Sequence, residues 1–384
     1  MKQIILFFTF AICFSTFGQI SNFKTKFDLP EEVKETSGLL LINGKIVTHN
    51  DSGDIANLYE IDSLSGNLTR SINVSNATNV DWEDLAEDNT HIYVGDIGNN
   101  SGDRTDLKIY KILKTDYLAD ISVTAEIINF SYEDQTDFTT RPNANNFDAE
   151  AFVIYQNSIF IFTKNWTNLQ TNVYKIPNVA GTYSAEKVST GNVQVLITGA
   201  AYDLNSDTFF LTSYDTNANP FLIYIDKNRM PGDDVFFSGF NKLTVEIEQG
   251  SQIEGITNFG NGNYYISREF VSVMQGGMTF TFSQRLYEFL DNTFYLLGVD
   301  NNKNNFDFSI APNPVKDKLY ISKKNNQGLI SGIKIFSILG KEISKIQITY
   351  DNSLIDVAEL KNGIYLIKIT FDNQQTVTKR FIKL

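Results

Sequence analysis

A repeated unit constrains this chain more than any other feature of its sequence. The stretch VDWEDLAEDNTHIYVGDIGNNSGDRTDLKIYKIL, residues 80–113, joins a short apolar strand, a turn, a second β-rich strand, a polar loop and a third strand that carries a tyrosine. Related stretches begin at Glu35, Phe147, Ile197 and Gln252. Self-similarity at a period of roughly fifty residues, with several strands in each unit, is typical of repeat architectures such as β-propellers.

A fourth candidate strand usually follows each unit, as in LTRSINV, AEIINFSY and TVEIE. Four strands in each of five units predict an all-β fold, a five-bladed propeller over residues 19–300. The long interval between Glu83 and Glu150 contains TDFTTRPNANN, which is either a loop or part of a sixth blade. A strand within residues 20–34 is expected to complete the last blade. One tyrosine in each unit predicts packing between neighbouring blades, and these tyrosines are Tyr59, Tyr110, Tyr174, Tyr224 and Tyr287.

The charge is divided unevenly along the chain. Of the 32 basic and 45 acidic residues, 12 basic and 7 acidic lie in residues 307–384, which leaves 20 basic and 38 acidic in the rest. The larger part therefore carries −18, which argues against nucleic acid as a partner. Such a charge is compatible with divalent cations or basic ligands, and equally with an inert acidic surface.

Residues 1–18 have the pattern of a secretory signal peptide. Lys2 precedes the apolar run IILFFTFAICF, and small residues before Gln19 offer a cleavage site. The run is too short for a membrane anchor, and Ile12 disfavours lipidation of Cys13, the only cysteine. No later segment is long and apolar enough to span a membrane, so the mature chain is expected to be secreted or held at the cell surface.

Carboxylates recur at one aligned position, at the first turn of the repeats. The aligned residues are Ser37, Glu83, Glu150, Gly199 and Glu254. Because the blades of a propeller bring equivalent positions towards one axis, Glu83, Glu150 and Glu254 are expected to approach one another, with Asp96 nearby. Converging carboxylates repel unless a cation or protons compensate them, and oxygen-rich clusters suit Ca²⁺. The alternative is that each carboxylate caps a turn within its own blade.

A second aligned column mixes charges of both signs, in Asp51, Ile97, Lys164, Ser213 and Arg268. Asp51, Lys164 and Arg268 are therefore candidates for binding a ligand, and the two basic residues for binding an anion held by a metal. Nucleophilic catalysis has little support, because the chain has only His49 and His91, no free cysteine outside the leader and no G-x-S-x-G motif.

The composition changes after Asp300. Residues 301–305, NNKNN, form a polar linker, and alternating short strands in residues 306–384 predict a small immunoglobulin-like β-sandwich. This tail resembles the C-terminal sorting domain of the type IX secretion system. The residues that carry the resemblance are Pro312, Asn313, Pro314, Asp317, Gly340, Gly363 and Tyr365, with the basic run at 379–383. The resemblance implies export through the type IX machinery; the alternative, a carbohydrate-binding sandwich, lacks an aromatic platform.

The turns WEDLA, AEAF and IEGI in the propeller region are similar to those of phytase-like and esterase-like propellers. That resemblance implies a calcium-dependent hydrolase of phosphoesters as the alternative function. The first hypothesis is a secreted propeller that binds an unidentified extracellular ligand, with Ca²⁺ at its acidic rim. Fold alone does not decide between them.

Overall fold

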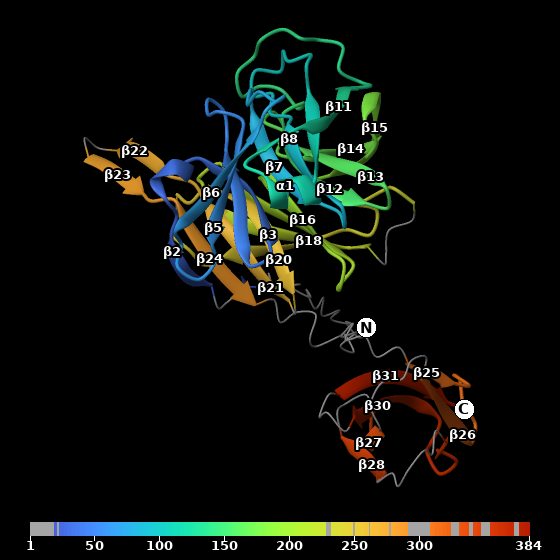
Figure 1. Cartoon of the computed structure of the whole chain (residues 1–384). Coiled ribbons are helices and arrows are strands. Elements are labelled where there is room, and N and C mark those ends of the chain that lie inside the picture. The colour runs from blue at the N-terminus through green and yellow to red at the C-terminus, as the bar shows by residue number, and fades with distance from the viewer. Residues whose placement is uncertain are drawn as a thin grey trace, which may run out of the picture. The chain divides into compact units, whose positions relative to one another are not determined.

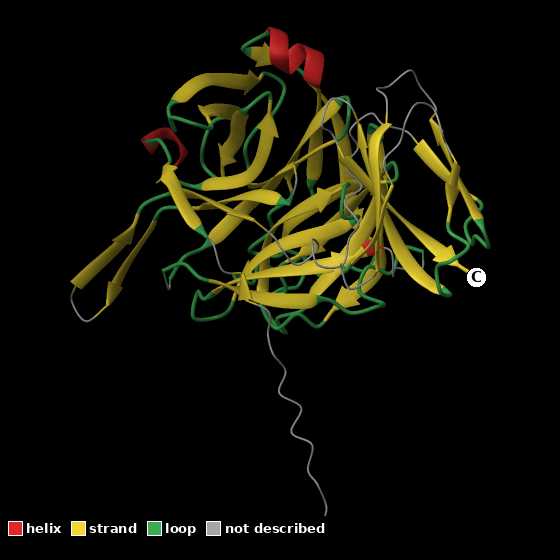
Figure 2. Cartoon of the chain, turned by 90° about the horizontal axis from the view of Figure 1, so that it is seen from below, coloured by secondary structure: helices red, strands yellow, loops and turns green. Residues whose placement is uncertain are grey.

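Strands make up nearly all the regular structure of the chain, as the repeated units predict (Figures 1 and 2). The computed structural model describes residues 19–20, 23–227, 232–248, 250–260, 262–275 and 278–290, and further along residues 308–323, 330–337, 341–346, 354–371 and 376–384. The predicted signal peptide, the predicted linker and Gly340 lie outside these residues. The chain divides into the units Met1–Asp291 and Asn292–Leu384, which are described separately.

Each of the five repeats in the first unit contributes antiparallel strands to one blade, and the outer strands of the second and third blades also pair in parallel, which joins these two blades into one sheet of eight. The innermost strands are β3 (Thr36–Ile42), β7 (Trp82–Glu87), β12 (Ala149–Tyr155), β16 (Leu196–Asp203) and β20 (Ile253–Gly260). The second strands are β4 (Lys45–Asn50), β8 (His91–Asp96), β13 (Ser158–Thr163), β17 (Thr208–Tyr214) and β21 (Asn263–Arg268). The third strands are β5 (Asn57–Asp62), β9 (Lys108–Leu113), β14 (Thr171–Pro177), β18 (Pro220–Asp226) and β24 (Arg285–Leu290).

The outer strand of the last blade comes from the start of the chain. The outer strands are β6 (Leu68–Val74), β11 (Ala125–Tyr132), β15 (Gly181–Gly191), β19 (Asn241–Val245) and, in the fifth blade, β2 (Lys24–Asp28). β2 pairs antiparallel with β24, as expected for a strand that completes the ring. Two short strands add to outer edges, since β1 (Gln19–Ile20) pairs with β19 and β10 (Ser122–Val123) with β6.

The innermost strands form a closed ring of five. β3 packs against β7, β7 against β12, β12 against β16, β16 against β20, and β20 against β3. The segment TDFTTRPNANN is a loop. The short helix α1 (Lys114–Ala119) lies earlier in the same interval between Glu83 and Glu150. The propeller therefore has five blades, and the sixth that the long interval left open is not formed.

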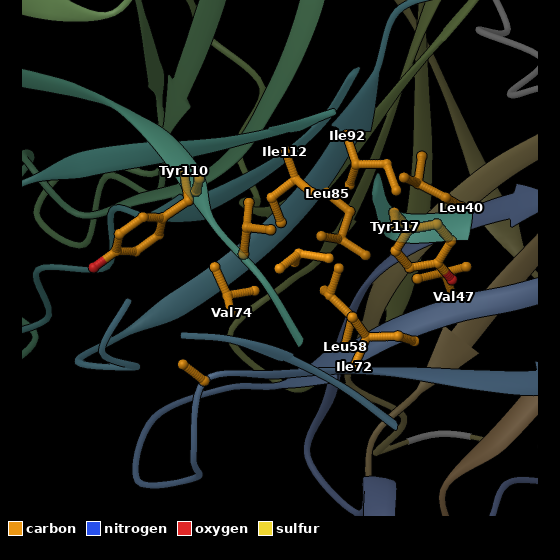
Figure 3. Packing of buried hydrophobic residues seen from close by; sticks show 14 of the residues in the cluster. Leu40, Val47, Leu58, Ile72, Val74, Leu85, Ile92, Tyr110, Ile112 and Tyr117 are labelled. Atoms are coloured by element: carbon orange, nitrogen blue, oxygen red, sulfur yellow. The ribbon is translucent and has the colours of Figure 1, made fainter. Parts of the chain in front are cut away.

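Hydrophobic side chains from neighbouring blades fill the space between the sheets. Figure 3 shows one such cluster, in which Leu40, Val47 and Leu58 of the first blade meet Leu85 and Ile92 of the second. Burying each of these side chains stabilises the fold by about 1.5–3 kcal/mol.

Three of the repeated tyrosines, Tyr59, Tyr110 and Tyr174, belong to such clusters. Tyr110 is buried between the first and second blades and donates a hydrogen bond to the Thr78 carbonyl at 3.3 Å. Tyr174 is buried between the second and third blades and donates one to Asp134. Tyr59 and Tyr287 are also buried, whereas Tyr224 is half-buried.

The second unit consists of two facing sheets. One contains β25 (Phe308–Ala311), β26 (Lys318–Lys323) and β29 (Leu354–Asp356). The other contains β27 (Ile330–Ser337), β28 (Glu342–Ile346), β30 (Gly363–Phe371) and β31 (Thr376–Lys383). Buried residues of both sheets, such as Leu319 and Ile367, share one core, which makes the unit a β-sandwich. Asn313 fastens the first loop to β31, because its side chain donates to the Arg380 carbonyl and accepts from the Ile382 N–H.

Among the described residues, no helix has the length and apolar character that crossing a membrane requires.

Candidate functional site

A β-bulge recurs at the same end of every blade. The pairing of the two innermost strands shifts register between Ser37 and Leu40, Trp82 and Asp84, Ala149 and Ala151, Ile197 and Gly199, and Ile253 and Ile256. Glu83, Glu150 and Glu254 lie within these shifts. Because a bulge leaves one residue outside the ladder and re-aims its side chain, it directs the three glutamates away from the sheet and towards the end of the ring.

The three glutamates line one pocket of about 360 Å³. The residues that line it are Ser37, Asp51, Glu83, Asn100, Asn143, Glu150, Lys164, Trp166, Tyr214, Gln252, Glu254 and Glu269. The structure thus brings together the glutamates of the aligned column, with Asp51 and Lys164 of the second column. It adds residues that the alignment did not place there, notably Tyr214, Glu269 and Gln252.

The alignment is one residue out in the fourth and fifth blades. An equivalent backbone hydrogen bond identifies the residues of the second aligned column. The N–H of Asp51 donates to the Glu35 carbonyl, that of Lys164 to the Asp148 carbonyl, and that of Glu269 to the Gln252 carbonyl. Glu269, rather than Arg268, is therefore the equivalent of Lys164. In the fourth blade, strand pairing likewise places Thr198 rather than Gly199 in the first aligned column, and Tyr214 rather than Ser213 in the second. The alignment assumed the same number of residues between the two columns in every repeat. This fails because the β16–β17 turn is longer and β20 has a second register shift after Asn258.

Two predicted site residues do not line the pocket. Arg268 is buried, and its guanidinium donates to Glu248, to Ser251 and to the Ser283 carbonyl. Asp96 is also buried, and its Oδ1 lies 2.8 Å from Nη2 of Arg104. Successive residues of a strand point to opposite sides, so the one-residue error turned Arg268 away from the site. The structure therefore places Arg268 and Asp96 outside the lining of the pocket, apart from the other predicted site residues.

The ammonium group of Lys164 balances part of the negative charge of the pocket. Its Nζ lies 3.0 Å from Glu150 Oε1, and both side chains are buried. The ammonium also lies 5.0 Å from the ring centre of Trp166 and 5.3 Å from that of Tyr214. Burial lowers the pKa of Lys164, but the neighbouring carboxylates, with Glu150 first, outweigh it and raise that pKa well above its usual value. The lysine is therefore a fixed positive charge, held by Glu150.

Carboxyl groups in and beside the pocket lack a basic partner. Asp51, Asp81 and Glu83 each offer an oxygen, and these oxygens lie within 4.8 Å of one another. Glu83, Asp148 and Glu150 form a second such group. Among the described residues no ion pair involves any of the first three. Burial and mutual repulsion raise the pKa of Asp81 to about 7 and that of Glu83 well above its usual value.

Two details show how closely Glu83 is enclosed. The side chain is 3% exposed, and its Oε1 has no hydrogen-bond partner. A Cβ at Gly98 would overlap the carboxylates of Glu83 and Asp81, so a larger residue there would have to displace them. An unpartnered carboxylate oxygen in such a place is costly.

The neighbouring Asp84 has a different role. Its buried carboxylate accepts hydrogen bonds from the backbone N–H groups of Leu85, Phe152 and Ala200, which belong to three blades. His49 is also buried, and its Nδ1 donates to the Asn50 carbonyl. Burial lowers the pKa of His49 to about 4, so the ring is neutral at pH 7. Asp84 therefore ties three blades together, the His49 ring packs edge-on against Trp82 of the second blade, and neither residue lines the pocket.

Solved structures with partial similarity include two extracellular domains from B. thetaiotaomicron, described as parts of a one-component and a hybrid two-component system. Their identities are 8% and 9% and their TM-scores 0.32 and 0.33, over 96% and 95% of this chain. The chain spans 60% of the length of each. Kuenenia stuttgartiensis hydrazine synthase has 9% identity and a TM-score of 0.33, over 92% of this chain and 97% of its own. The fold described above rests on this chain's own strand pairing.

No curated protein matches the chain. The model of the secretion system C-terminal sorting domain matches residues 309–383. This match covers the two-sheet sandwich and all seven residues on which the resemblance was based. Residues 309–383 are therefore a C-terminal sorting domain of the type IX secretion system, and the chain is a β-propeller protein that this system exports to the cell surface or the extracellular space.

Proposed function

We propose that the exported propeller is a ligand-binding module that holds Ca²⁺ in the acidic pocket and contacts an extracellular ligand through it. The observation that carries the proposal is the buried Glu83, whose Oε1 has no partner although Asp51 and Asp81 lie beside it. The proposal places the cation among these three residues, with Asp148 next to them.

The charge balance of the pocket supports a bound cation. Five carboxyl groups line it, against Lys164 as the one basic residue among its lining residues. Glu150 already holds that lysine. The remaining carboxylates either keep protons or need a second positive charge, because like charges at this distance raise each other's pKa.

The donor set favours a hard cation. Oxygens of Asp51, Asp81 and Glu83 converge, and no cysteine or histidine lines the pocket. Ca²⁺ takes about six to eight oxygen ligands in flexible geometry, whereas Zn²⁺ prefers nitrogen and sulfur. Three carboxylates leave several coordination positions open for water or a ligand. Asn100, Asn143 and Trp166, which are exposed or half-buried, surround the pocket as further contacts.

Calorimetric titration with Ca²⁺ tests this proposal. We expect binding by the wild type, and loss of binding in Glu83→Gln, which keeps the side-chain shape but removes the charge. Glu186→Gln is the matched control, because Glu186 is exposed on the outer strand β15. Absence of heat with wild-type protein at millimolar Ca²⁺ and neutral pH would overturn the proposal, as would equal binding by Glu83→Gln.

A second candidate is Ca²⁺-dependent hydrolysis of phosphoesters. One observation favours it, namely that the ammonium of Lys164 lies in the same pocket as the carboxylates. The assay is release of nitrophenolate from p-nitrophenyl phosphate by wild-type protein with Ca²⁺ and with chelator. Turnover that needs Ca²⁺ and is lost in Lys164→Met supports the hydrolase; Ca²⁺ binding without turnover supports the binding module.

A further inference from the structure

A two-stranded ribbon extends from the fifth blade, outside the ring of sheets. It consists of β22 (Val271–Gln275) and β23 (Met278–Phe282), inserted between β21 and β24. We call residues 270–284 the arm. Figures 1 and 2 both show its strands reaching away from the propeller. Within the described residues, the arm contacts the blades at its base, where Arg268 lies 5.6 Å from the ring centre of Phe282 and the Phe270 N–H donates to the Lys34 carbonyl.

The arm differs in charge from the rest of its domain. Residues 270–284, FVSVMQGGMTFTFSQ, contain no charged residue, within the part of the chain that carries −18. Several of its apolar side chains are exposed, with Met274 79% and Phe280 43% accessible. An uncharged apolar projection on an acidic protein is typical of an interaction surface.

Both edges of the arm are open. Its strands form a sheet of two, to which no other strand of the described residues adds. Natural proteins usually protect such edges with Lys, Pro or a bulge. The arm has no Lys or Pro, and its two strands pair without a shift in register. An isolated two-stranded ribbon is marginally stable, whereas three or more strands are stable. The arm therefore lacks the pairing that would complete it.

The sequence of β23 is suited to pairing with itself. Its five residues, Met-Thr-Phe-Thr-Phe, are nearly symmetric about Phe280. In an antiparallel pair centred there, Phe280 lies opposite the Phe280 of a second copy, and each Thr279 lies opposite a Thr281. Aromatic and Thr–Thr pairs are favourable across strands. The same operation on β22 places Ser272 opposite Met274 and Val271 opposite Gln275, which offers no such matching.

We propose that two copies of the chain associate through their arms, with the free edge of β23 pairing antiparallel to that of its copy about Phe280. The result is a four-stranded sheet across a twofold axis, an isologous contact in which one patch meets itself. The partner is a second copy because the arm has no charge with which to recognise an acidic or basic partner, and because β23 is its own complement. This inference does not depend on the cation pocket.

The acidic propellers oppose this association. Each carries a large negative charge, so the arms meet most readily when salt screens the repulsion, over a Debye length of about 10 Å at 0.1 M. We expect sedimentation velocity of the full chain to show a dimer that strengthens as the salt concentration rises. Thr281→Lys places two like charges in the paired edge and should abolish the dimer. The melting temperature should change little, because the arm lies outside the ring.

Cysteine cross-linking tests the register. Cys13 is the only cysteine, so a Cys13→Ala chain offers a background without thiols. Opposite residues of an antiparallel pair have Cα atoms about 4.5–5.5 Å apart, within disulfide range. We expect Phe280→Cys to give a disulfide-linked dimer, and a mixture of Thr279→Cys and Thr281→Cys to give the mixed dimer. Thr279→Cys alone should not cross-link, since two Thr279 positions are about 8 Å apart in this register.

Met274→Cys, on the exposed β22, is the control for random collision. The proposal is overturned if the chain remains monomeric at high salt and high concentration, or if Met274→Cys cross-links as fast as Phe280→Cys. A dimer that forms the Phe280→Cys link but not the mixed one would contradict edge pairing and indicate packing of the ribbon faces.

Discussion

The cation-free propeller should lose stability as the pH rises from 5 to 7. The cause is the group of carboxylates in the pocket. Burial, together with Asp51 and Asp148, raises the pKa of Asp81 to about 7. Burial, with Asp51 again the main repelling charge, raises the pKa of Glu269 to about 7 as well.

The sign follows from proton binding. In the unfolded chain Asp81 releases its proton near pH 3.8, whereas in the folded chain it does so near pH 7. Between these values the folded state binds more protons, so the free energy of unfolding falls as the pH rises, by about 1.4 kcal/mol per pH unit. Allowing for partial titration near pH 7, Asp81 alone accounts for about 2 kcal/mol between pH 5 and 7. Glu269 acts in the same direction. Buried His49 acts in the opposite direction and offsets part of this loss, because it takes up its proton near pH 6.5 in the unfolded chain and near pH 4 in the folded chain.

A loss of about 2 kcal/mol lowers the melting temperature of a domain of this size by roughly 4–8 °C. The assay is differential scanning calorimetry of the full chain with chelator at pH 5, 6 and 7. Asp81→Asn removes this titration and should reduce the pH dependence, while saturating Ca²⁺ should abolish it because the cation stabilises the ionised carboxylates. Carboxyl groups of lowered pKa, such as Asp88 at about 2, titrate below this range. A melting temperature in chelator that stays constant or rises from pH 5 to 7 would refute the reasoning.

Three further predictions concern stability and export. Tyr174→Ala removes a buried ring between two blades and should cost about 3–5 kcal/mol in urea unfolding; a loss under 1 kcal/mol would contradict the packing. Asp84→Ala leaves three backbone N–H groups without their acceptor and should cost several kcal/mol, at about 1–3 kcal/mol for each unsatisfied group; an unchanged urea midpoint would show that the carboxylate does not tie the blades. Deleting residues 309–383 should leave the folded propeller in the periplasm, which fractionation and immunoblotting would show; normal amounts in the medium or at the surface would speak against the sorting role.

Much of the architecture was predictable from the repeat. The first strands, the turns and the tyrosines recur in order, and blades that close a ring must bring equivalent positions together. Glu83, Glu150 and Glu254 were therefore expected to converge, and they line one pocket. The sorting domain was recognisable because its residues follow a fixed order over a short stretch.

The rest depended on features that single-sequence spacing does not reveal. A second bulge in β20 displaced the alignment of the fifth blade by one residue, which exchanged Glu269 for Arg268. Because Lys164 pairs with Glu150, the carboxyl groups without a basic partner are Asp51, Asp81 and Glu83 instead of the three aligned glutamates. The arm was overlooked because its strands lie inside the connection between β21 and β24 and repeat nowhere else.

Anomalous diffraction from crystals soaked in Ca²⁺ tests most directly whether a cation binds among Asp51, Asp81 and Glu83. We expect one strong peak with carboxylate oxygens of all three residues about 2.3–2.6 Å away, and no peak at that place in Glu83→Gln. A wild-type pocket without a peak, with these carboxylates bonded only to the protein or to water, would contradict it.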